Sequence, residues 1–287
     1  HTAMYIFADS GSTKTNWLIT DTKGEVLNGF QTIGLNPYFV TKERILQTIG
    51  EKFPYEIDPL KIQTVFFYGS GCSAQDQHEH LRFALEDYFY EAKVKIFSDM
   101  LGTARAIFKN NKGIAAIIGT GTNSCLYNGA SISQNAISLG FILGDEGSGA
   151  YIGKQFAKMY LEKRFEPELS KKILEETGAT HSSILSAIYQ NPHPNRYLAD
   201  FCIFIKNNIE HPQLQKIIRI SFDRFFERYI KIYENFDNYK LGFCGSIALN
   251  FKDFINEIAI SYDIKDPVFI NKPLDGLIEY HKLNNFD

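Results

Sequence analysis

The stretch Tyr5-Ile-Phe-Ala-Asp9-Ser-Gly11-Ser12-Thr13-Lys14-Thr15-Asn-Trp-Leu-Ile19 decides how the rest of the sequence is interpreted. One apolar run ends at Asp9, a short turn of glycine and hydroxyl residues follows, and a second apolar run begins at Trp17. This pattern predicts a β-hairpin with a polar tip. Such a tip suits a polyphosphate, because glycine lets the backbone approach closely and the neighbouring N–H and hydroxyl groups donate hydrogen bonds. The predicted phosphate contacts are Gly11, Ser12, Thr13, Lys14 and Thr15.

Asp9, at the entrance to this tip, is the predicted metal ligand, because a carboxylate beside a polyphosphate can hold Mg²⁺ together with its water shell. Two better-known phosphate motifs do not match. The P-loop needs glycine directly before its Lys-Ser/Thr, where this chain has Thr13, and the dinucleotide fingerprint needs a third glycine that is missing. Ordinary turn chemistry remains the alternative, since glycine, serine and threonine are common turn residues.

A second stretch, Ile114 to Tyr127, repeats the layout of an apolar strand, a Gly/Thr turn and another strand. A repeat at this spacing is too long for a solenoid and suggests two similar halves, each with one phosphate loop facing a shared cleft. The predicted contacts in the second loop are Gly119, Thr120, Gly121 and Thr122.

The bulk composition is that of an ordinary globular protein of one large or two modest domains. The 287 residues are 44% hydrophobic and 22% charged, with a formal net charge of −3. This charge gives no basic footprint for nucleic acid or an anionic membrane, and no apolar run is long enough to cross a bilayer. The four cysteines are widely spaced, without a CxxC pair, and no signal-peptide pattern is present. We therefore expect free thiols and a cytoplasmic location.

Asp99 follows the predicted strand Val94 to Phe97 and precedes a helical pattern that runs to Phe108. Open α/β sheets bind their ligands at this junction between the carboxyl end of a strand and the next helix. The alternative is that Asp99 only caps the helix or supplies a first-turn acid.

Three further loops contain candidate ligand contacts. Asn36 lies in a Gly/Pro-bounded loop, where it contacts a polar ligand or simply forms a turn. The segment Gly144-Asp145-Glu146-Gly147-Ser148 combines adjacent acids with a high density of glycine, which favours a functional loop. Gly245 opens a helix after a strand, where a glycine allows either contact with a flat ring such as adenine or tight helix packing.

A polar break over residues 109–113 predicts a domain boundary, with an N-terminal lobe over 4–110 and a C-terminal lobe over 111–271. Periodicity predicts a mainly helical insert from Tyr151 to Asn235, including one long helical segment from Pro212 to Phe236. Another helix is predicted over Ile247 to Ile260.

Taken in order, these motifs resemble those of the N-acetylglucosamine kinases and cover essentially the whole chain. That family belongs to the actin, hexokinase and heat-shock-chaperone ATPase superfamily, as do the activator ATPases of 2-hydroxyacyl-CoA dehydratases. The resemblance implies an α/β fold of two ribonuclease-H-like, actin-like ATPase lobes around a central nucleotide and sugar cleft, with the C-terminal helix over 272–287 packed back on the first lobe.

The resemblance also implies ATP and Mg²⁺ as cofactors, a small-molecule sugar substrate and, since the family often forms dimers, a homodimer. Asp99 corresponds to the catalytic base, and Gly245 to the adenosine motif, which often has paired glycines where this chain has Gly245-Ser246. Asn36, Asn123 and Asp145 correspond to sugar contacts. The implied enzyme is a phosphotransferase with an alcohol group as acceptor, most simply acting on the 6-hydroxyl of N-acetylglucosamine, while glucosamine, N-acetylmannosamine and glucose stay open as substrates. The alternative is an activator-type ATPase that acts on a protein partner.

Overall fold

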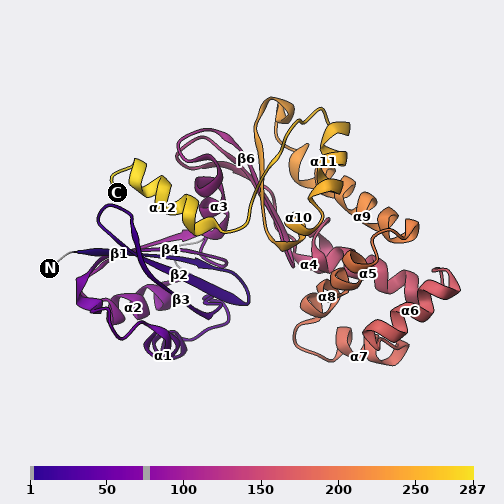
Figure 1. Ribbon diagram of the computed structural model, residues 1–287, viewed down its shortest axis with the longest axis horizontal. Helices are drawn as coiled ribbons and strands as arrows, with labels where there is room; N and C mark the ends of the chain where they lie inside the picture. Colours follow the sequence, from indigo (N-terminus) through magenta and orange to yellow (C-terminus); the bar gives the residue numbers. More distant parts are fainter. Residues whose placement is uncertain (1–2, 74–77) are drawn as a thin grey trace. The chain divides into compact units, whose positions relative to one another are not determined.

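The computed structural model describes residues 3–73 and 78–287, and the chain divides into two compact units (Figure 1). The first unit contains the residues up to Asn111 together with Asn128–Ser131 and Lys272–Asp287, and the second contains Lys112–Tyr127 and Ile132–Asn271. Each unit is built on one five-stranded mixed sheet. The predicted α/β class with two lobes of the actin-like ATPase type is therefore confirmed.

The first sheet has the strand order β3-β2-β1-β4-β5. Its strands are β1 Met4–Ser10, β2 Lys14–Asp21, β3 Val26–Ile33, β4 Ile62–Gly69 and β5 Lys93–Ser98. The first three strands are antiparallel neighbours, whereas β4 and β5 run parallel to β1. Parallel pairing brings the carboxyl ends of β1, β4 and β5 to the same edge of the sheet.

Helices cover both faces of this sheet (Figure 1). Helices α1 Lys42–Lys52 and α2 Glu79–Tyr88 lie on one face, where Ile45, Ile49 and Leu85 are fully buried in the core of the unit. Helices α3 Asp99–Phe108 and α12 Pro273–Leu283 lie on the other face. The short 3₁₀ turn Pro59–Lys61 leads into β4.

Helix α12 returns from the end of the chain to pack closely on α3. A Cβ at Gly276 would come within contact of the Ala106 carbonyl oxygen, so only glycine permits this approach of the two backbones. Beyond the helix, the ring of Phe286 stacks on Tyr5 of β1 at a centroid distance of 4.4 Å. The first unit is therefore completed by residues from both ends of the sequence.

The second sheet has the order β10-β9-β6-β7-β8. Its strands are β6 Gly113–Ile118, β7 Thr122–Tyr127, β8 Ile132–Asn135, β9 Leu241–Cys244 and β10 Val268–Ile270. Strands β6, β7 and β8 are antiparallel neighbours, and β9 and β10 continue the sheet in parallel with β6. This is the topology of the first sheet, so the internal repeat read from the two Gly/Thr turns extends to both folds.

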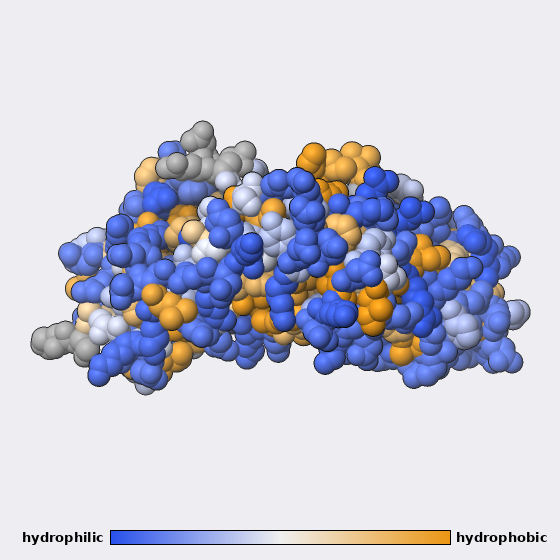
Figure 2. Space-filling model, turned by 90° about the horizontal axis from the view of Figure 1, so that it is seen from above, coloured by the Kyte–Doolittle hydropathy of each residue, from blue (hydrophilic) through white to orange (hydrophobic). Residues whose placement is uncertain are grey.

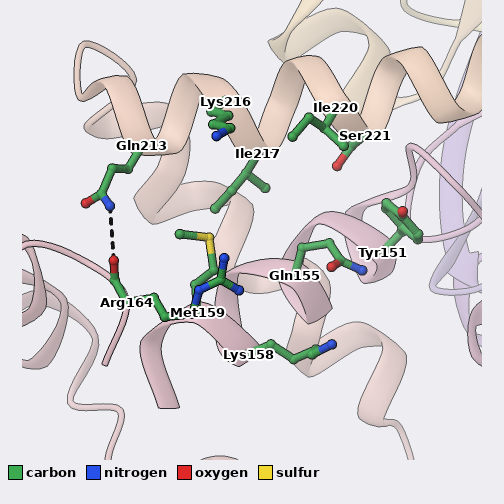
Figure 3. A pocket seen from close by; sticks show the side chains of 10 residues that line it. All are labelled: Tyr151, Gln155, Lys158, Met159, Arg164, Gln213, Lys216, Ile217, Ile220 and Ser221. Carbon is green, nitrogen blue, oxygen red and sulfur yellow. Dashed lines mark hydrogen bonds between the residues drawn. The ribbon is translucent and has the colours of Figure 1, made fainter. Parts of the chain in front are cut away.

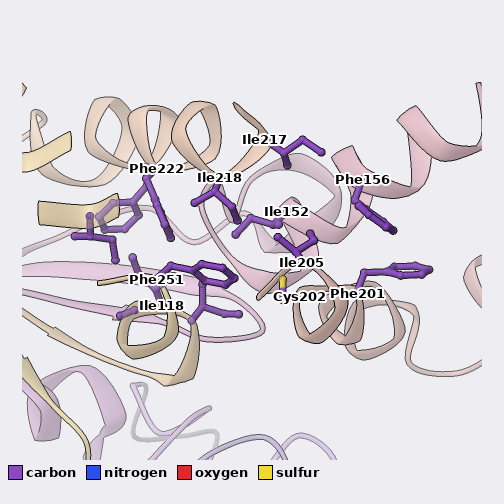
Figure 4. Packing of buried hydrophobic residues seen from close by; sticks show 14 of the residues in the cluster. Ile118, Ile152, Phe156, Phe201, Cys202, Ile205, Ile217, Ile218, Phe222 and Phe251 are labelled. Atoms are coloured by element: carbon purple, nitrogen blue, oxygen red, sulfur yellow. The ribbon is translucent and has the colours of Figure 1, made fainter. Parts of the chain in front are cut away.

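The second unit carries most of the helices. They are α4 Gly140–Leu143, α5 Gly149–Leu161, α6 Pro167–Thr177, α7 His181–Tyr189, α8 Pro194–Asn207, α9 Pro212–Phe225, α10 Ser246–Asn250 and α11 Lys252–Ser261. Figure 4 shows how the core forms where α5, α8 and α9 meet: Phe156, Phe201 and Phe222 lie between the helices with Ile152 and Ile218.

Two predicted helices are interrupted. The predicted segment Pro212 to Phe236 is α-helical only to Phe225, and a π-helical turn, Phe226–Ile230, follows before the 3₁₀ turn Phe236–Asn238. The predicted helix over Ile247 to Ile260 divides into α10 and α11 at Phe251, which is 2% exposed and anchored in the core. Apolar periodicity continues through both interruptions, so it does not reveal them.

Hydrophilic side chains cover most of the face shown in Figure 2, and apolar ones form scattered groups. In the part of the chain that the structure describes, no helix is both long and apolar enough to cross a membrane.

Candidate functional site

In the first unit, the predicted site residues gather at the carboxyl ends of β1, β4 and β5. Asp9 is paired in register with Tyr68 of β4, and Ser98, directly before Asp99, is paired with Gly69. Burial and, to a smaller extent, the charge of Asp99 raise the pKa of Asp9 and of the buried Cys72 thiol, as expected for groups at one edge of the sheet. The fold thus brings together acids that are 90 positions apart in the sequence.

Asp9 is a carboxyl group with a strongly perturbed pKa. Burial, reinforced by the charge of Asp99 and opposed by Lys14, raises the pKa of Asp9 to about 7. Its side chain makes no hydrogen bond or ion pair within residues 3–73 and 78–287. A desolvated anion without a partner is unfavourable, and a cation bound there would restore the ionised form.

Asp99 is the first residue of α3, and Ser98 is the N-cap whose hydroxyl accepts the Leu101 N–H at 3.1 Å. The helix is therefore capped without Asp99, although one Asp99 oxygen accepts the N–H of Met100 at 2.9 Å. Burial raises the pKa of Asp99. Of the two forms of the alternative, the N-cap is Ser98 rather than Asp99, whereas Asp99 is indeed an acid in the first turn of α3.

The turn between β1 and β2, residues 11–13, is exposed and is closed by the Gly11 N–H, which donates to the Lys14 carbonyl at 3.0 Å. Gly34 supports it from behind. The Gly34 N–H donates to the Thr13 carbonyl at 2.9 Å, and a Cβ at position 34 would lie 2.5 Å from the Gly11 carbonyl oxygen. Ser12, Thr13 and Lys14 remain at the surface, where a ligand can reach them.

Thr15 differs from its neighbours because it is completely buried. Its hydroxyl lies 2.8 Å from Ser10 Oγ and 2.8 Å from the Ile33 carbonyl oxygen. Ser10 Oγ in turn accepts the Leu35 N–H at 3.0 Å. Thr15 thus joins β1, β2 and the segment after β3, which fixes the base of the turn.

Asn36 lies beside the loop that follows β4. Its Oδ1 accepts the Tyr38 N–H at 3.0 Å, and a Cβ at Gly71 would collide with the Asn36 side chain. Gly71 also has φ +78°, so glycine is required there both for conformation and for space. Asn36 is therefore held at the same edge of the sheet as the loop after β4.

In the second unit, the turn Gly119–Gly121 is tied to the start of α5. The Gly149 and Ala150 N–H groups donate to the Gly119 and Thr120 carbonyls at 2.8 and 3.2 Å. The first N–H groups of α5 therefore hold the turn in place, which orients its own N–H groups and the Thr120 side chain.

Asp145 is fixed in the loop before α5. It is 8% exposed and has φ 57°, and its N–H donates to the Tyr229 hydroxyl at 3.0 Å. Its Oδ1 accepts a long hydrogen bond, 3.4 Å, from the Thr122 N–H. Burial is the main cause of its raised pKa. The left-handed backbone of a buried aspartate is uncommon and typical of a functional position.

Asn123 and Gly245 lie at the same end of the second sheet. Asn123 follows Thr122 on β7, is partly exposed, and its Oδ1 accepts the Ser124 N–H at 2.9 Å. Gly245 follows β9 with φ 111°, and a Cβ there would collide with the Ile118 carbonyl, directly before Gly119. Of the two interpretations of Gly245, close backbone packing is thus observed, and contact with a nucleotide stays a prediction.

Sequence reasoning did not identify two supporting residues, Gly34 and Tyr229. Gly34 lies in the Gly/Pro loop, so its glycine was a detectable signal, but its contact with residues 11–13 depends on β3 pairing with β2. Tyr229 lies in the π-helical turn and contacts a loop 84 positions earlier. Such turns are frequent at functional sites, but no local pattern in this sequence marked one.

Among the described residues, no group of three or more histidine, cysteine or acidic side chains could hold a metal ion on its own.

The sequence matches no protein-family model. Solved structures give a clear relationship. A candidate N-acetylglucosamine kinase from Porphyromonas gingivalis is 35% identical, with a TM-score of 0.89 over 98% of this chain and 99% of the other. The chain belongs to the N-acetylglucosamine kinase family. This kinase is accordingly a phosphotransferase with an alcohol group as acceptor, and kinases of this kind use ATP.

More distant structures show the same fold. A candidate N-acetylglucosamine kinase from Chromobacterium violaceum is 16% identical, with a TM-score of 0.74 over 97% of this chain and 99% of the other. A ROK hexokinase from Thermus thermophilus is 12% identical, with a TM-score of 0.60 over 98% of each chain.

Proposed function

We propose that this kinase transfers the γ-phosphoryl group of ATP to the 6-hydroxyl of N-acetylglucosamine, with Asp99 as the general base. The main support is the half-buried, desolvated Asp99 carboxyl, which lies at the carboxyl end of β5 in the first turn of α3, a helix that Ser98 caps. The proposed substrate is that of the 35% identical relative, which is described as a candidate N-acetylglucosamine kinase.

Asp99 accepts the proton of the sugar hydroxyl as that oxygen attacks phosphorus in line. Burial raises the pKa of Asp99, which makes its carboxylate a stronger base than one in water. The Met100 N–H holds one oxygen, so the carboxylate is oriented before the substrate arrives.

The two turns bind the phosphates in this proposal. Ser12, Thr13 and the Lys14 ammonium group are exposed at the first turn, and the Thr120 side chain and the N–H groups of residues 119–121 belong to the second. Gly11 and Gly119 leave room for close approach of the backbone to phosphate oxygens. Thr15 and Thr122 are buried, so their contribution is to hold the turns. Gly245 contacts the adenosine.

Asp9 holds Mg²⁺, which supplies charge neutralisation on the transferred phosphoryl group when bound. The carboxyl of Asp9, which has no partner in residues 3–73 and 78–287 and whose pKa is raised to about 7, fits this role. Asp9 loses its residual proton when it binds the cation, and the Lys14 charge favours the same ionised form.

Asn36, Asn123 and Asp145 recognise the sugar hydroxyls and the acetamido group. One side-chain oxygen of each accepts a hydrogen bond from the backbone N–H of another residue, which orients the side chain before a sugar binds. A site built in this way rejects sugars that leave its buried polar groups unpaired.

We also propose a homodimer in the cytoplasm. Ile137, Ile142 and Leu143 are 73–79% exposed and supply apolar surface for a subunit contact. None of the four cysteines forms a disulfide, which is compatible with a reducing compartment. Light scattering checks the dimer, and a monomer at micromolar concentration would exclude it.

The activator-type alternative gains no support from the cysteines. The activator ATPases share an iron–sulfur cluster that bridges two subunits, which needs thiolates at the subunit surface. All four cysteines of this chain are buried: Cys72, Cys125, Cys202 and Cys244.

The test is ADP formation with Mg²⁺ and N-acetylglucosamine, glucosamine, N-acetylmannosamine, glucose or no sugar. We expect stimulation by N-acetylglucosamine and a turnover that is lower by roughly two to four powers of ten in Asp99→Asn. The matched control is Asp253→Asn, which also removes a first-turn acid, from α11, and leaves turnover unchanged. Near-normal turnover in Asp99→Asn would exclude Asp99 as the general base. Turnover that does not depend on sugar would favour the activator-type ATPase.

A further inference from the structure

A pocket of about 400 Å³ lies between α5 and α9, within the second unit (Figure 3). Each helix contributes side chains at intervals of three and four residues, so one face of each helix lines the pocket. Its volume is within the range of small-molecule sites. It shares no residue with the phosphate turns or with the proposed sugar contacts.

The charged lining of this pocket is entirely positive. Lys158 of α5, Lys216 of α9 and Arg164 from the connection after α5 surround it, and none of the lining residues is acidic. Arg164 pairs with Glu162 at 3.3 Å, and the ammonium groups of Lys158 and Lys216 make no ion pair or hydrogen bond with any described residue. Two positive charges are thus available to an anion at no cost in broken contacts.

The floor of the pocket is apolar. Met159 and the 5% exposed Ile217 face each other across it, and Ile220 borders it (Figure 3). The positive rim attracts an anion. Binding is further stabilised when the apolar floor covers an apolar part of the ligand.

Both ends of the pocket are held in place. At one end, Gln213 donates through Nε2 to the Arg164 carbonyl at 3.1 Å and accepts the Glu166 N–H at 2.9 Å, which ties the connection to α9. At the other end, the hydroxyl of Ser221 is fully buried and has no hydrogen-bond partner among the residues that the structure describes. A buried hydroxyl in a lining residue without a partner is consistent with a ligand that supplies one.

We propose that this pocket is a second ligand site, which binds a small organic phosphate through Lys158, Lys216 and Arg164 and covers its apolar or aromatic part with Met159 and Ile217. A phosphate monoester is favoured over a carboxylate because it carries nearly two negative charges and enough acceptor oxygens for several cations.

The site adjoins the loop that carries Asp145. A Cβ at Gly147 would lie 2.7 Å from Phe225 Cβ and 3.4 Å from the Ser221 carbonyl oxygen, and the Tyr151 N–H donates to Ser148 Oγ at 3.0 Å. A ligand packed on Tyr151 and Ser221 therefore presses on the elements that support this loop. We expect it to change the apparent KM for the sugar, an expectation that rests on the proposed function.

The binding test uses phenyl phosphate as the probe, measured by calorimetry on the full chain. We expect phenyl phosphate to bind at least about tenfold more tightly than inorganic phosphate or phenol, since only phenyl phosphate meets both requirements. The double variant Lys158→Gln/Lys216→Gln should weaken binding by about tenfold, because it removes two exposed charge contacts. The control Lys252→Gln/Lys265→Gln makes the same change in net charge at exposed positions of the same unit and should bind as the wild type does.

Three results would overturn the site: no measurable binding, equal weakening in both double variants, or loss of binding in Lys14→Ala, which would place the anion at the first turn. The second readout is the sugar KM with and without phenyl phosphate. A change in the wild type that is absent from Lys158→Gln/Lys216→Gln supports the regulatory effect. If phenyl phosphate binds but the sugar KM is unchanged, the regulatory effect is refuted and the ligand site still stands. If the proposed function is wrong, neither the wild type nor any variant turns over sugar.

Discussion

At the scale of single residues, Asp9 and Asp99 are proposed to have two different roles in similar environments. Both are acids at strand ends, and burial raises the pKa of each. Asp9 has no hydrogen-bond partner in the described chain, which suits a cation ligand, whereas Asp99 is oriented by the Met100 N–H, which suits a base. The two proposed roles differ because the local hydrogen bonding of the two carboxyl groups differs, although the residue type is the same.

The raised pKa of Asp9 predicts a conflict between stability and function. The folded protein binds a proton at Asp9 up to about pH 7, and the unfolded chain releases it near 3.8, so stability due to this group is lost as the pH rises from about 4 to 7. We expect Asp9→Asn to increase the free energy of unfolding at pH 8 by roughly 1–3 kcal/mol, and much less at pH 4, while lowering kinase activity.

Urea unfolding followed by the fluorescence of Trp17, the single tryptophan of the chain, measures this effect in the first unit. Added Mg²⁺ should stabilise the wild type at pH 8 and not Asp9→Asn. The control Asp87→Asn removes an exposed acid that pairs with Lys42 and should change stability little at either pH. Equal gains at pH 4 and pH 8 would contradict the titration argument.

At the scale of elements, the β1–β2 turn depends on a neighbour outside the hairpin. Gly34 follows β3 and contacts the carbonyls of Gly11 and Ser12 so closely that no side chain fits. The turn is therefore shaped by three strands, and its conformation is set by contacts within the first unit.

We expect Gly34→Ala to displace this turn and raise the KM for ATP by about tenfold or more, with a smaller effect on the KM for the sugar. The physical reason is that the added Cβ would lie 2.5 Å from the Gly11 carbonyl oxygen, which cannot move without the turn. Steady-state kinetics measures both constants. In the control Gly50→Ala, the new methyl in α1 meets only a 3.7 Å contact, so neither constant should change. A Gly34→Ala enzyme with wild-type ATP affinity would show that the turn is not the phosphate site.

Helix α12 makes the stability of the first unit depend on pH through His281, which is completely buried beside Phe66 and Tyr68. One ring nitrogen lies 2.7 Å from the Tyr68 hydroxyl, and that hydroxyl also accepts a hydrogen bond from Arg105 at 3.0 Å. Burial, with the positive charges of Arg105 and Lys95, lowers the pKa of His281 to about 3. The histidine is therefore neutral in the folded protein.

Because the unfolded chain protonates His281 near pH 6.5 and the folded chain does so only near pH 3, stability is lost as the pH falls through this window. We expect the first unit to lose roughly 2–3 kcal/mol between pH 7 and pH 4.5 from this group. His281→Phe should be less stable at pH 7, since the Tyr68 partner is removed, but should lack this acid-dependent loss. His193→Phe, which changes an exposed histidine, serves as the control. The same acid dependence in His281→Phe would assign the loss to other groups.

At the scale of the whole molecule, two units with the same strand order carry different parts of the proposed chemistry. The first contains the acids Asp9 and Asp99, and the second contains Asp145, Asn123 and Gly245. The first unit is discontinuous, because Lys272–Asp287 completes it, whereas the second is nearly continuous from Lys112 to Asn271.

This organisation predicts that removal of residues 272–287 selectively unfolds the first unit. Leu274, Leu277 and Ile278 are buried in the full chain, and their loss exposes the face of β1 and α3 that α12 covers. Trp17 fluorescence should lose its cooperative transition in the truncated chain. Circular dichroism should still show cooperative unfolding, and the fragment 112–271 should fold by itself. A truncated chain with a normal Trp17 transition would show that α12 is dispensable.

The sequence by itself determined the two hairpin turns, their repetition and most elements, because these features are written in local periodicity and in glycine placement. Two five-stranded sheets of equal order follow from that repeat. Tertiary structure decided what local patterns do not contain: the break of the α9 segment into a π-helical turn, the support of residues 11–13 by Gly34, and the contact of Tyr229 with Asp145. The acids Asp9 and Asp99 were each identifiable by position, but their mutual effect on pKa arises only when β1, β4 and β5 pair in parallel. Local propensity acts over a few residues, whereas burial and charge act through space, so the chemistry of the site is fixed only by the assembled fold.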